Sequence, residues 1–151
     1  MKKRYLIAAT LMVLPAVSAI AANPNPAFKL RHQNFEAMGK AMKGIFDEFK
    51  KPAVNMATIK ANSAILSQAA KKVSGHFPKG TGPEAGVKTE ALPAIWEKPV
   101  EFKAATDRLV TATAGLQAAA ALGDMAKIQA AAGAVGGSCK GCHESFRKPK
   151  A

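Results

Sequence analysis

The sequence predicts an all-α protein, a left-handed antiparallel four-helix bundle. Beyond its first residues, the chain has apolar positions every three or four residues and no alternating strand pattern of useful length. The average repeat lies near 3.5 residues, which favours helices that cross at about 20°. The chain has 151 residues, 48% of them hydrophobic, which suits one domain with a single core. An irregular all-α domain made of the same helices is the alternative.

The first 21 residues are predicted to be a cleaved signal peptide. A basic start over residues 2–4 precedes an apolar run over 5–17 and small residues up to Ala22. These small residues contain the A-x-A pattern that a signal peptidase accepts. The apolar run is shorter than the roughly 20 residues of a membrane span, although an uncleaved anchor is the alternative. Cleavage after Ala21 leaves 22–151 as the mature domain, which we expect in a bacterial periplasm without stable membrane insertion.

Two helices are predicted in the first half of the mature chain. The first ends before Pro52, because proline cannot continue the helical hydrogen bonds. Its apolar positions are Phe28, Phe35, Met38, Met42, Ile45 and Phe49. The second begins near Asn55, a good N-cap residue. We expect it to bury Ile59, Leu66 and Val73, with Ile65, Ala69 and Ala70 beside them.

Two more helices follow a long loop. Seven of the twenty residues from Ser74 to Pro93 are Gly or Pro, which indicates a loop. The third helix opens around Pro99, since proline is tolerated in a first turn, and ends at Gly123. Its apolar positions are Phe102, Ala105, Leu109, Ala112, Leu116 and Ala119. Asp124 is the expected cap of the fourth helix. Its apolar face comprises Met125, Ile128, Ala132, Val135, Cys139, Cys142 and Phe146.

The most informative motif lies on this last apolar face. Cys139 and Cys142 are three residues apart, and His143 follows directly. Cys-x-x-Cys-His is the attachment sequence of c-type haem. Residues three and four apart are neighbours on a helix, so both thiols can meet the haem vinyl groups while the imidazole reaches the iron. Export agrees with this interpretation, because haem is joined to such motifs outside the cytoplasm.

Two other chemistries compete for the motif. A redox dithiol of the thioredoxin type needs a strand–helix context that the chain lacks. A zinc site needs four ligands, and only two further histidines are present. Glycines at positions 133, 136 and 137 precede the motif and suggest room for a flat macrocycle.

With these residues in place, the chain resembles the cytochrome c′ family over nearly all of its mature length. The resemblance rests on Cys-Lys-Gly-Cys-His-Glu-Ser-Phe-Arg at 139–147, Ile95-Trp96-Glu97 followed by Phe102, Phe77-Pro78, and Arg31. It implies one covalent haem c, with Cys139 and Cys142 as thioether anchors and His143 as the axial iron ligand. It also implies Arg147 beside the proximal pocket and Arg31 near a haem propionate, where a guanidinium suits a carboxylate.

The resemblance also identifies the residue that faces the open side of the iron. That residue stands four positions after the first-helix arginine, and here it is Phe35. Phenylalanine has no donor atom, so we expect five-coordinate, high-spin iron in an apolar distal pocket. Such a protein would transfer electrons and bind small gases such as nitric oxide and carbon monoxide. The alternative is a six-coordinate, low-spin electron carrier that uses Met38 or Met42, although such methionines are commonly core residues.

Enzymatic activity is not expected. A peroxidase needs a distal acid–base residue, and none is available unless His32 turns inward. His32 and His76 are both expected at the surface. Trp96, the only tryptophan, either closes the haem edge or plugs the end of the bundle.

The charge of the chain bears on its partners. The mature chain keeps 19 basic and 10 acidic residues, a formal charge of +9. Only 6% of the residues are aromatic and no nucleic-acid motif is present, so nucleic acid is excluded as a partner. The basic charge would steer encounter with an acidic redox partner or an anionic membrane surface. The resemblance implies a homodimer through the first two helices, where the apolar residues expected outside the core are Ala41 and Ile45 or Phe46.

Overall fold

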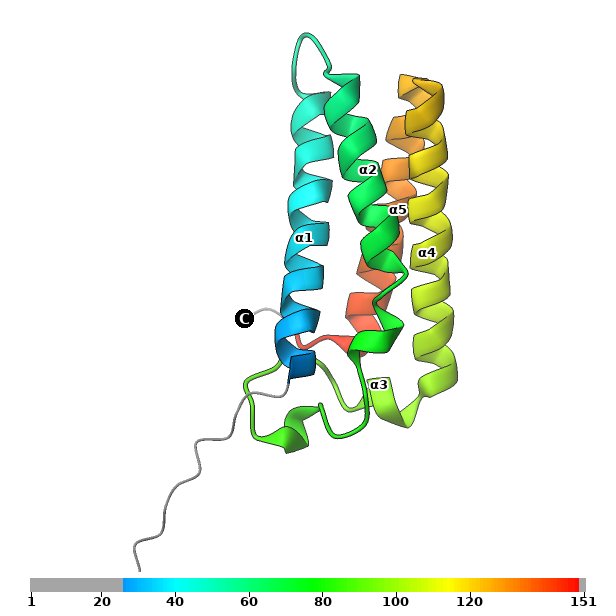
Figure 1. Ribbon diagram of the computed structural model, residues 1–151. Helices are drawn as coiled ribbons and strands as arrows, with labels where there is room; N and C mark the ends of the chain where they lie inside the picture. Colours follow the sequence, from blue (N-terminus) through cyan, green and yellow to red (C-terminus); the bar gives the residue numbers. More distant parts are fainter. Residues whose placement is uncertain (1–25, 150–151) are drawn as a thin grey trace, which may run out of the picture.

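A computed structural model describes residues 26–149, so the predicted signal peptide lies outside the described residues. Four long helices run antiparallel (Figure 1). They are α1 (Pro26–Phe49), α2 (Met56–Ala70), α4 (Pro99–Leu122) and α5 (Met125–Phe146). The predicted all-α four-helix bundle is confirmed. Within the described range there are no strands, and no helix has the length and apolar character needed to cross a membrane.

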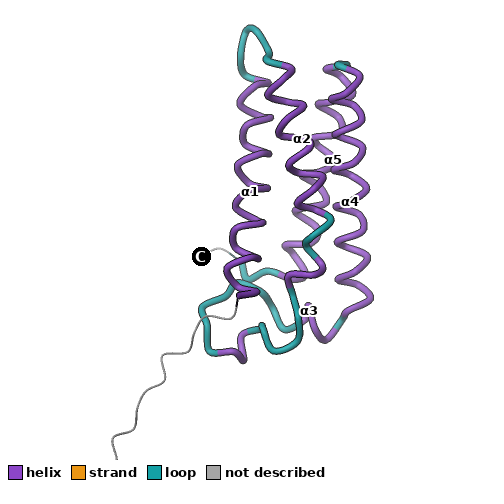
Figure 2. The backbone as a smooth tube through the Cα atoms, viewed as in Figure 1, coloured by secondary structure: helices purple, strands orange, loops and turns teal. Residues whose placement is uncertain are grey.

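The backbones of successive long helices pack closely on one another, but the first and last of these helices do not. The backbone of α1 packs on α2, α2 on α4, and α4 on α5. The pair α1 and α5 has no comparable close approach of the backbones. Figure 2 shows that the bundle has a short loop at the α1–α2 end and a long loop region at the other. The wider spacing of α1 and α5 is relevant because α5 carries the Cys-x-x-Cys-His motif.

The predicted helix boundaries follow their capping residues. The Asn55 side chain accepts hydrogen bonds from the N–H groups of Ala57 (3.0 Å) and Thr58 (3.2 Å) at the start of α2. Asp124 does the same for Lys127 (3.1 Å) at the start of α5. Gly123 ends α4 with a φ of 77°, the left-handed conformation that glycine adopts readily. These three positions therefore confirm the predicted boundaries.

The core matches the predicted apolar faces with two corrections. Ile59 and Leu66 of α2, Leu109 and Leu116 of α4, and Ile128 and Val135 of α5 are buried. Ala41 and Ile45 are also buried, so the expectation that Ala41 lies outside the core is wrong, and of the alternatives Ile45 and Phe46 it is Phe46, at 41% exposure, that lies outside. Ala41 and Ile45 both lie on the face of Met38, three and seven residues on, and that face meets the other helices. Ile65 is 45% exposed because it lies one residue, about 100°, away from Leu66.

The long loop is packed against one end of the bundle. It contains two single turns, η1 (Ser74–His76) and η2 (Pro83–Ala85), and leads into the short helix α3 (Ala94–Glu97). Phe77 is its main anchor, with ring centroids 6.2 Å from Phe35, 5.1 Å from Phe102 and 6.1 Å from Trp96. The ring centroids of Phe102 and Phe146 are in turn 5.2 Å apart. Each edge-to-face pair contributes roughly 0.5–1.5 kcal/mol beyond its buried area, so this aromatic cluster fixes the loop to α1, α4 and α5.

Candidate functional site

The two cysteines lie one turn apart on α5. Both are free thiols, half-buried and packed against the hydrophobic core. Burial raises the pKa of the Cys139 thiol. Burial and the neighbouring Cys139 raise the pKa of Cys142, while Arg108 opposes this shift. Reactive redox cysteines have lowered pKa values, so this pair has the properties of inert, core-facing thiols.

His143 follows the second cysteine but is exposed on α5. The motif therefore presents two inward thiols and an imidazole at the border with solvent. Within α5, Gly133 and Gly137 are exposed and Gly136 is half-buried. A Cβ atom added at any of these glycines would meet no other atom within 4 Å. The helix thus has open space in the two turns before the motif.

On α1, Phe35 is half-buried and joins the edge of the aromatic cluster through Phe77. Met38 is more deeply buried, at 6% exposure, and its Sδ lies 3.9 Å from the side-chain nitrogen of Asn34. Met42 is half-buried. Phe35, which we expect to face the open side of the iron, and the two methionines considered as alternative ligands therefore all pack toward the interior. Of the three, Phe35 lies nearest the loop end of α1.

Arg31 is almost fully buried, at 7% exposure. Its Nε donates to the carbonyl of His76 (3.0 Å), and its terminal nitrogens donate to the carbonyl (3.1–3.2 Å) and hydroxyl (2.7 Å) of Thr81. The guanidinium carbon also lies 4.1 Å from the centroid of Phe77. Burial lowers the pKa of Arg31. Within residues 26–149, its hydrogen-bond partners are all neutral oxygens, so a buried positive charge lacks an acidic counterpart.

His76 differs from the surface position expected for it. It is half-buried, and its Nε2 is fully buried without a hydrogen-bond partner. Burial, followed by the charges of Lys72 and Arg31, lowers the pKa of this imidazole. The Ser138 hydroxyl, one residue before Cys139, is also buried without a partner. His32 is exposed, as predicted.

Arg147 and Trp96 both hold the loop end of the bundle. The Arg147 guanidinium forms an ion pair with Glu90, through Nε at 2.7 Å and through a terminal nitrogen. Its backbone forms an isolated bridge with Ala91. The Trp96 indole donates to the carbonyls of Phe77 and Pro78, both at 3.1 Å. These two hydrogen bonds tie Trp96 to the loop at this end of the bundle, and either role predicted for it is consistent with them.

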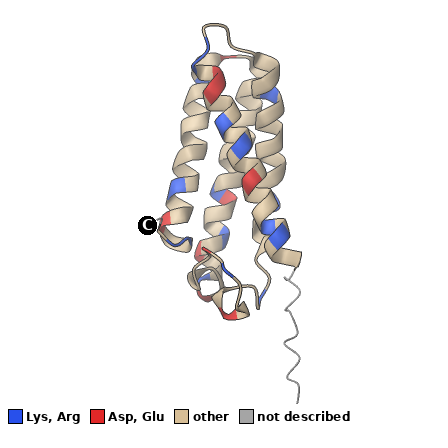
Figure 3. Cartoon of the chain, turned by 90° about the vertical axis from the view of Figure 1, so that its left-hand side faces the viewer, with Lys and Arg blue, Asp and Glu red and all other residues tan. Residues whose placement is uncertain are grey.

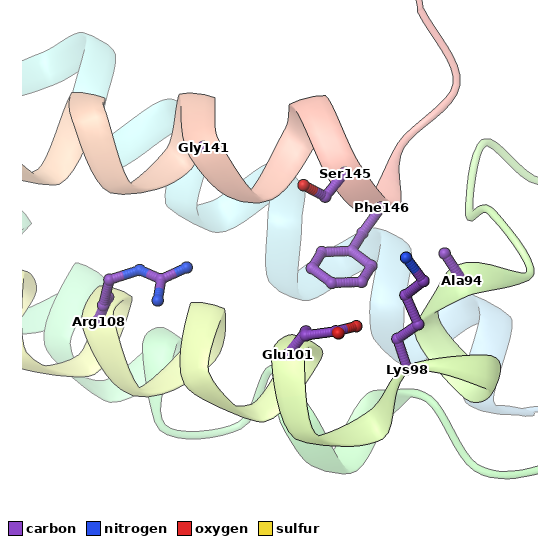
Figure 4. A pocket seen from close by; sticks show the side chains of 7 residues that line it. All are labelled: Ala94, Lys98, Glu101, Arg108, Gly141, Ser145 and Phe146. Carbon is purple, nitrogen blue, oxygen red and sulfur yellow. The ribbon is translucent and has the colours of Figure 1, made fainter.

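A separate cavity of about 320 Å³ lies between α3, α4 and α5 (Figure 4). Lys98, just before α4, and Glu101 and Arg108 of α4 project into it, opposite Ser145 and Phe146 of α5. Its lining includes neither the two thiols nor Phe35 and mixes charges of both signs. The part of the chain that the structure describes also contains no group of three His, Cys, Asp or Glu residues suited to a bare metal ion. The core-facing thiols, rather than this cavity, define the candidate site.

The residues at the candidate site suit a covalently bound haem. Two free thiols stand one helical turn apart, and an imidazole follows them. Unlike the pairs α1–α2, α2–α4 and α4–α5, the backbones of α1 and α5 do not approach closely. Among the described residues, Arg31 has no acidic counterpart and His76 Nε2 has no hydrogen-bond partner, and haem carries two carboxylates that can meet such needs. The donor set and these unmet polar groups therefore fit haem c.

Comparisons with known proteins agree with this chemistry. The sequence profile described as cytochrome c′ matches residues 26–147. A cytochrome c′ of Pararhodospirillum photometricum is 35% identical over 128 residues, which cover 84% of this chain and 100% of that protein. A nitric oxide complex of a variant cytochrome c′ from Alcaligenes xylosoxidans has a TM-score of 0.74 and 32% identity, covering 85% of this chain and 98% of that one.

A second similar structure is a cytochrome c′ described as having an unusual ligand-controlled dimer dissociation. Its TM-score is 0.76 at 25% identity, and the match covers 83% of this chain and 97% of that one. The profile match spans the whole bundle, including the Cys-x-x-Cys-His motif on α5. This chain therefore belongs to the cytochrome c′ family and carries one covalently bound haem c.

Proposed function

We propose that this protein is a periplasmic cytochrome with five-coordinate, high-spin haem that transfers single electrons and binds nitric oxide and carbon monoxide. The observation that carries the proposal is the pair of half-buried thiols on α5, followed by His143, in a bundle whose α1 presents Phe35 where the family has its distal residue. The nitric oxide complex of a relative supports the gas-binding part.

Each residue of the site has a defined task in this proposal. Cys139 and Cys142 hold the haem through thioether bonds, and His143 supplies the axial nitrogen. Arg31 neutralises a propionate, which supplies the missing counterion of its buried guanidinium. Arg147 borders the proximal side from the end of α5, where its ion pair with Glu90 orients it. When bound, the haem iron supplies one-electron redox chemistry and a coordination position for a gas.

Phe35 determines which ligands are favoured. Its ring excludes water and large ligands, and it has no hydrogen-bond donor to stabilise bound dioxygen. Small uncharged gases are therefore preferred. His32 is exposed, so it supports no acid–base role on the distal side, and we infer binding and electron transfer rather than catalysis.

The six-coordinate alternative rests on Met38. This methionine is buried on α1, close to one turn after Phe35, and its sulfur is a possible iron ligand. Met42 is less buried and lies one further turn away. In the five-coordinate proposal, both are core residues that fill irregular space.

Optical and electron paramagnetic resonance spectra of the purified protein test the proposal. We expect a high-spin ferric signal and a ferrous form that takes up carbon monoxide. A low-spin ferric spectrum with a methionine–iron charge-transfer band, together with no carbon monoxide uptake, would overturn it. The Met38→Leu variant then serves as the discriminating control, since loss of that band would identify Met38 as the ligand.

We also propose a homodimer. Three of the exposed large apolar side chains lie on the first two long helices: Leu30 and Phe46 on α1 and Ile65 on α2. The relative with ligand-controlled dimer dissociation supports this assembly. Sedimentation equilibrium should give twice the mass of the mature chain, and Phe46→Lys should shift it toward the monomer. A monomeric wild type at all concentrations would contradict the dimer.

A further inference from the structure

A buried cation and a buried ring nitrogen without a partner lie at the loop end of the bundle. The carbonyl of His76 accepts a hydrogen bond from Arg31, so the η1 turn is fixed directly beside the buried guanidinium. The Nε2 atom of the same histidine is buried without a partner. In the part of the chain that the structure describes, the hydrogen-bond acceptors of Arg31 are all neutral oxygens. A negatively charged hydrogen-bond acceptor placed here would balance the charge of Arg31 and bind the ring nitrogen of His76.

The charges around His76 explain why a carboxylate is the fitting group. The charged side chains acting on the imidazole are Arg31 from α1 and Lys72 from the turn after α2, and both are positive. Burial and these two cations disfavour the charged imidazole, and its buried ring nitrogen is left without a hydrogen bond, which is costly. A carboxylate would accept the Nε2–H bond and offset the two cations. The same carboxylate would balance the charge of Arg31.

We propose that His76 is a second hydrogen-bond donor, beside Arg31, for a haem propionate, and that its protonation tunes the reduction potential of the haem. The inference rests on the haem site proposed above, since it takes the carboxylate to be the propionate assigned to Arg31. His76 does not touch the iron in this arrangement. It acts as a positioning residue through the propionate.

The direction of the effect follows from charge. A proton on His76 adds positive charge near the haem and favours the ferrous state, which carries one positive charge fewer than the ferric state. The reduction potential should therefore fall as pH rises through the titration of His76. Histidine is the side chain that ordinarily titrates between about pH 5 and 8, so the slope belongs in that range.

The experiment is a potentiometric titration of the holoprotein at several pH values. We compare the wild type with His76→Gln and His76→Leu, and we use His32→Gln as the matched control, because His32 is exposed and adjacent to Arg31 in sequence. The pH-dependent fall in potential should be present in the wild type and in the control and absent from both His76 variants.

A second measurement separates a propionate bond from simple packing. The resonance Raman propionate bending mode should shift in His76→Leu and stay near its wild-type position in His76→Gln, whose amide can still donate. The Gln variant also keeps the inference testable if His76→Leu does not fold.

Three results would overturn the inference. They are a wild-type potential that does not change with pH, a slope that persists in His76→Gln, and a bending mode unmoved in His76→Leu. None of these bears on the spin state or carbon monoxide uptake, so this inference can fail while the proposed function stands. Conversely, a low-spin, methionine-ligated haem with an intact His76 slope would remove only the five-coordinate proposal.

Discussion

At the scale of single residues, α1 carries two buried charged side chains, of which one has a partner of opposite charge and the other has none among the described residues. Glu48 is 2% exposed and accepts hydrogen bonds from Lys51 (2.6 Å) and from the backbone N–H of Asn55 (2.9 Å). Arg31 is nearly as buried but has no acidic partner among the described residues. A buried charge is tolerated when it is paired. Glu48 is therefore a structural residue of the α1–α2 turn, whereas the haem propionate that we propose beside Arg31 would supply the charge partner of its guanidinium.

Glu48 should make stability depend on pH in the acid range. The hydrogen bonds from Lys51 and Asn55 lower its pKa below the ordinary glutamate value of about 4.3. Its contribution is therefore full above that value and is lost as pH falls through the lowered folded-state pKa. We expect Glu48→Gln to be less stable than the wild type at neutral pH, with the difference shrinking on acidification.

Urea unfolding at a series of pH values measures this effect. Glu36→Gln is the control, because Glu36 forms an exposed pair with Lys40 and such pairs contribute little. If Glu48→Gln and wild type lose stability in parallel on acidification, the carboxylate of Glu48 does not have the structural role assigned to it.

Phe35 should limit access of gases to the iron. Phe35→Ala removes the ring from the distal side, and relief of about 1.4 kcal/mol of crowding corresponds to roughly tenfold tighter binding. We expect carbon monoxide affinity of the ferrous protein to rise by about this factor. Flash photolysis gives both rate constants. Phe49→Ala, a half-buried phenylalanine at the other end of α1, should leave them unchanged; equal effects of the two variants would refute a distal position for Phe35.

At the scale of elements, helix ends determine where the loops begin. Asn55 satisfies two N–H groups at the start of α2 with one side-chain oxygen. Its backbone N–H also binds Glu48, so the α1–α2 turn and the α2 cap form one hydrogen-bonded unit. At the opposite end of the bundle, the aromatic cluster around Phe77 fixes a much longer loop to the helices.

Loss of the α2 cap should destabilise the bundle. Asn55→Ala leaves two N–H groups without their acceptor, and the cost of such a change is typically about 1 kcal/mol. Urea denaturation of the holoprotein should show this loss with an unchanged m-value. Gln68→Ala, an exposed change in the same helix, should cost nothing measurable. A midpoint unmoved in Asn55→Ala would show that solvent replaces the cap without loss.

At the scale of the whole molecule, the charged side chains are spread over the bundle. Figure 3 shows basic and acidic residues scattered over the bundle rather than gathered on one face of a single sign. Many pairs lie three or four residues apart within a helix, such as Lys103 with Asp107 and Lys140 with Glu144. Such exposed pairs add little stability. The excess of basic residues thus acts mainly through the long-range field of the molecule.

That field should be measurable in electron-transfer rates. We expect reduction by an anionic small-molecule reductant to slow as salt is added, because the Debye length shortens to about 10 Å at 0.1 M. A cationic reductant of similar potential is the matched probe and should show the opposite trend. Stopped-flow absorbance follows both reactions. Rates that are insensitive to salt with both reductants would contradict steering by the positive charge.

The sequence alone was sufficient for the helices and the chemistry of attachment. Apolar spacing places each buried face within its own helix, and Asn55, Gly123 and Asp124 mark boundaries through local hydrogen bonds. The Cys-x-x-Cys-His motif is equally local, because one helical turn brings its members together. These features depend on residues a few positions apart, which is why periodicity and capping chemistry predict them.

Only the tertiary structure decided what meets at the loop end. Arg31 donates a hydrogen bond to Thr81, which lies 50 residues further along the chain. His76 lies beside Arg31 with its Nε2 atom buried, although its position in a loop had predicted exposure. The burial of Ala41 likewise depends on which helices meet its face of α1. Contacts between distant segments follow from the path of the loop and the packing of Phe77, and no local pattern in the sequence encodes that path.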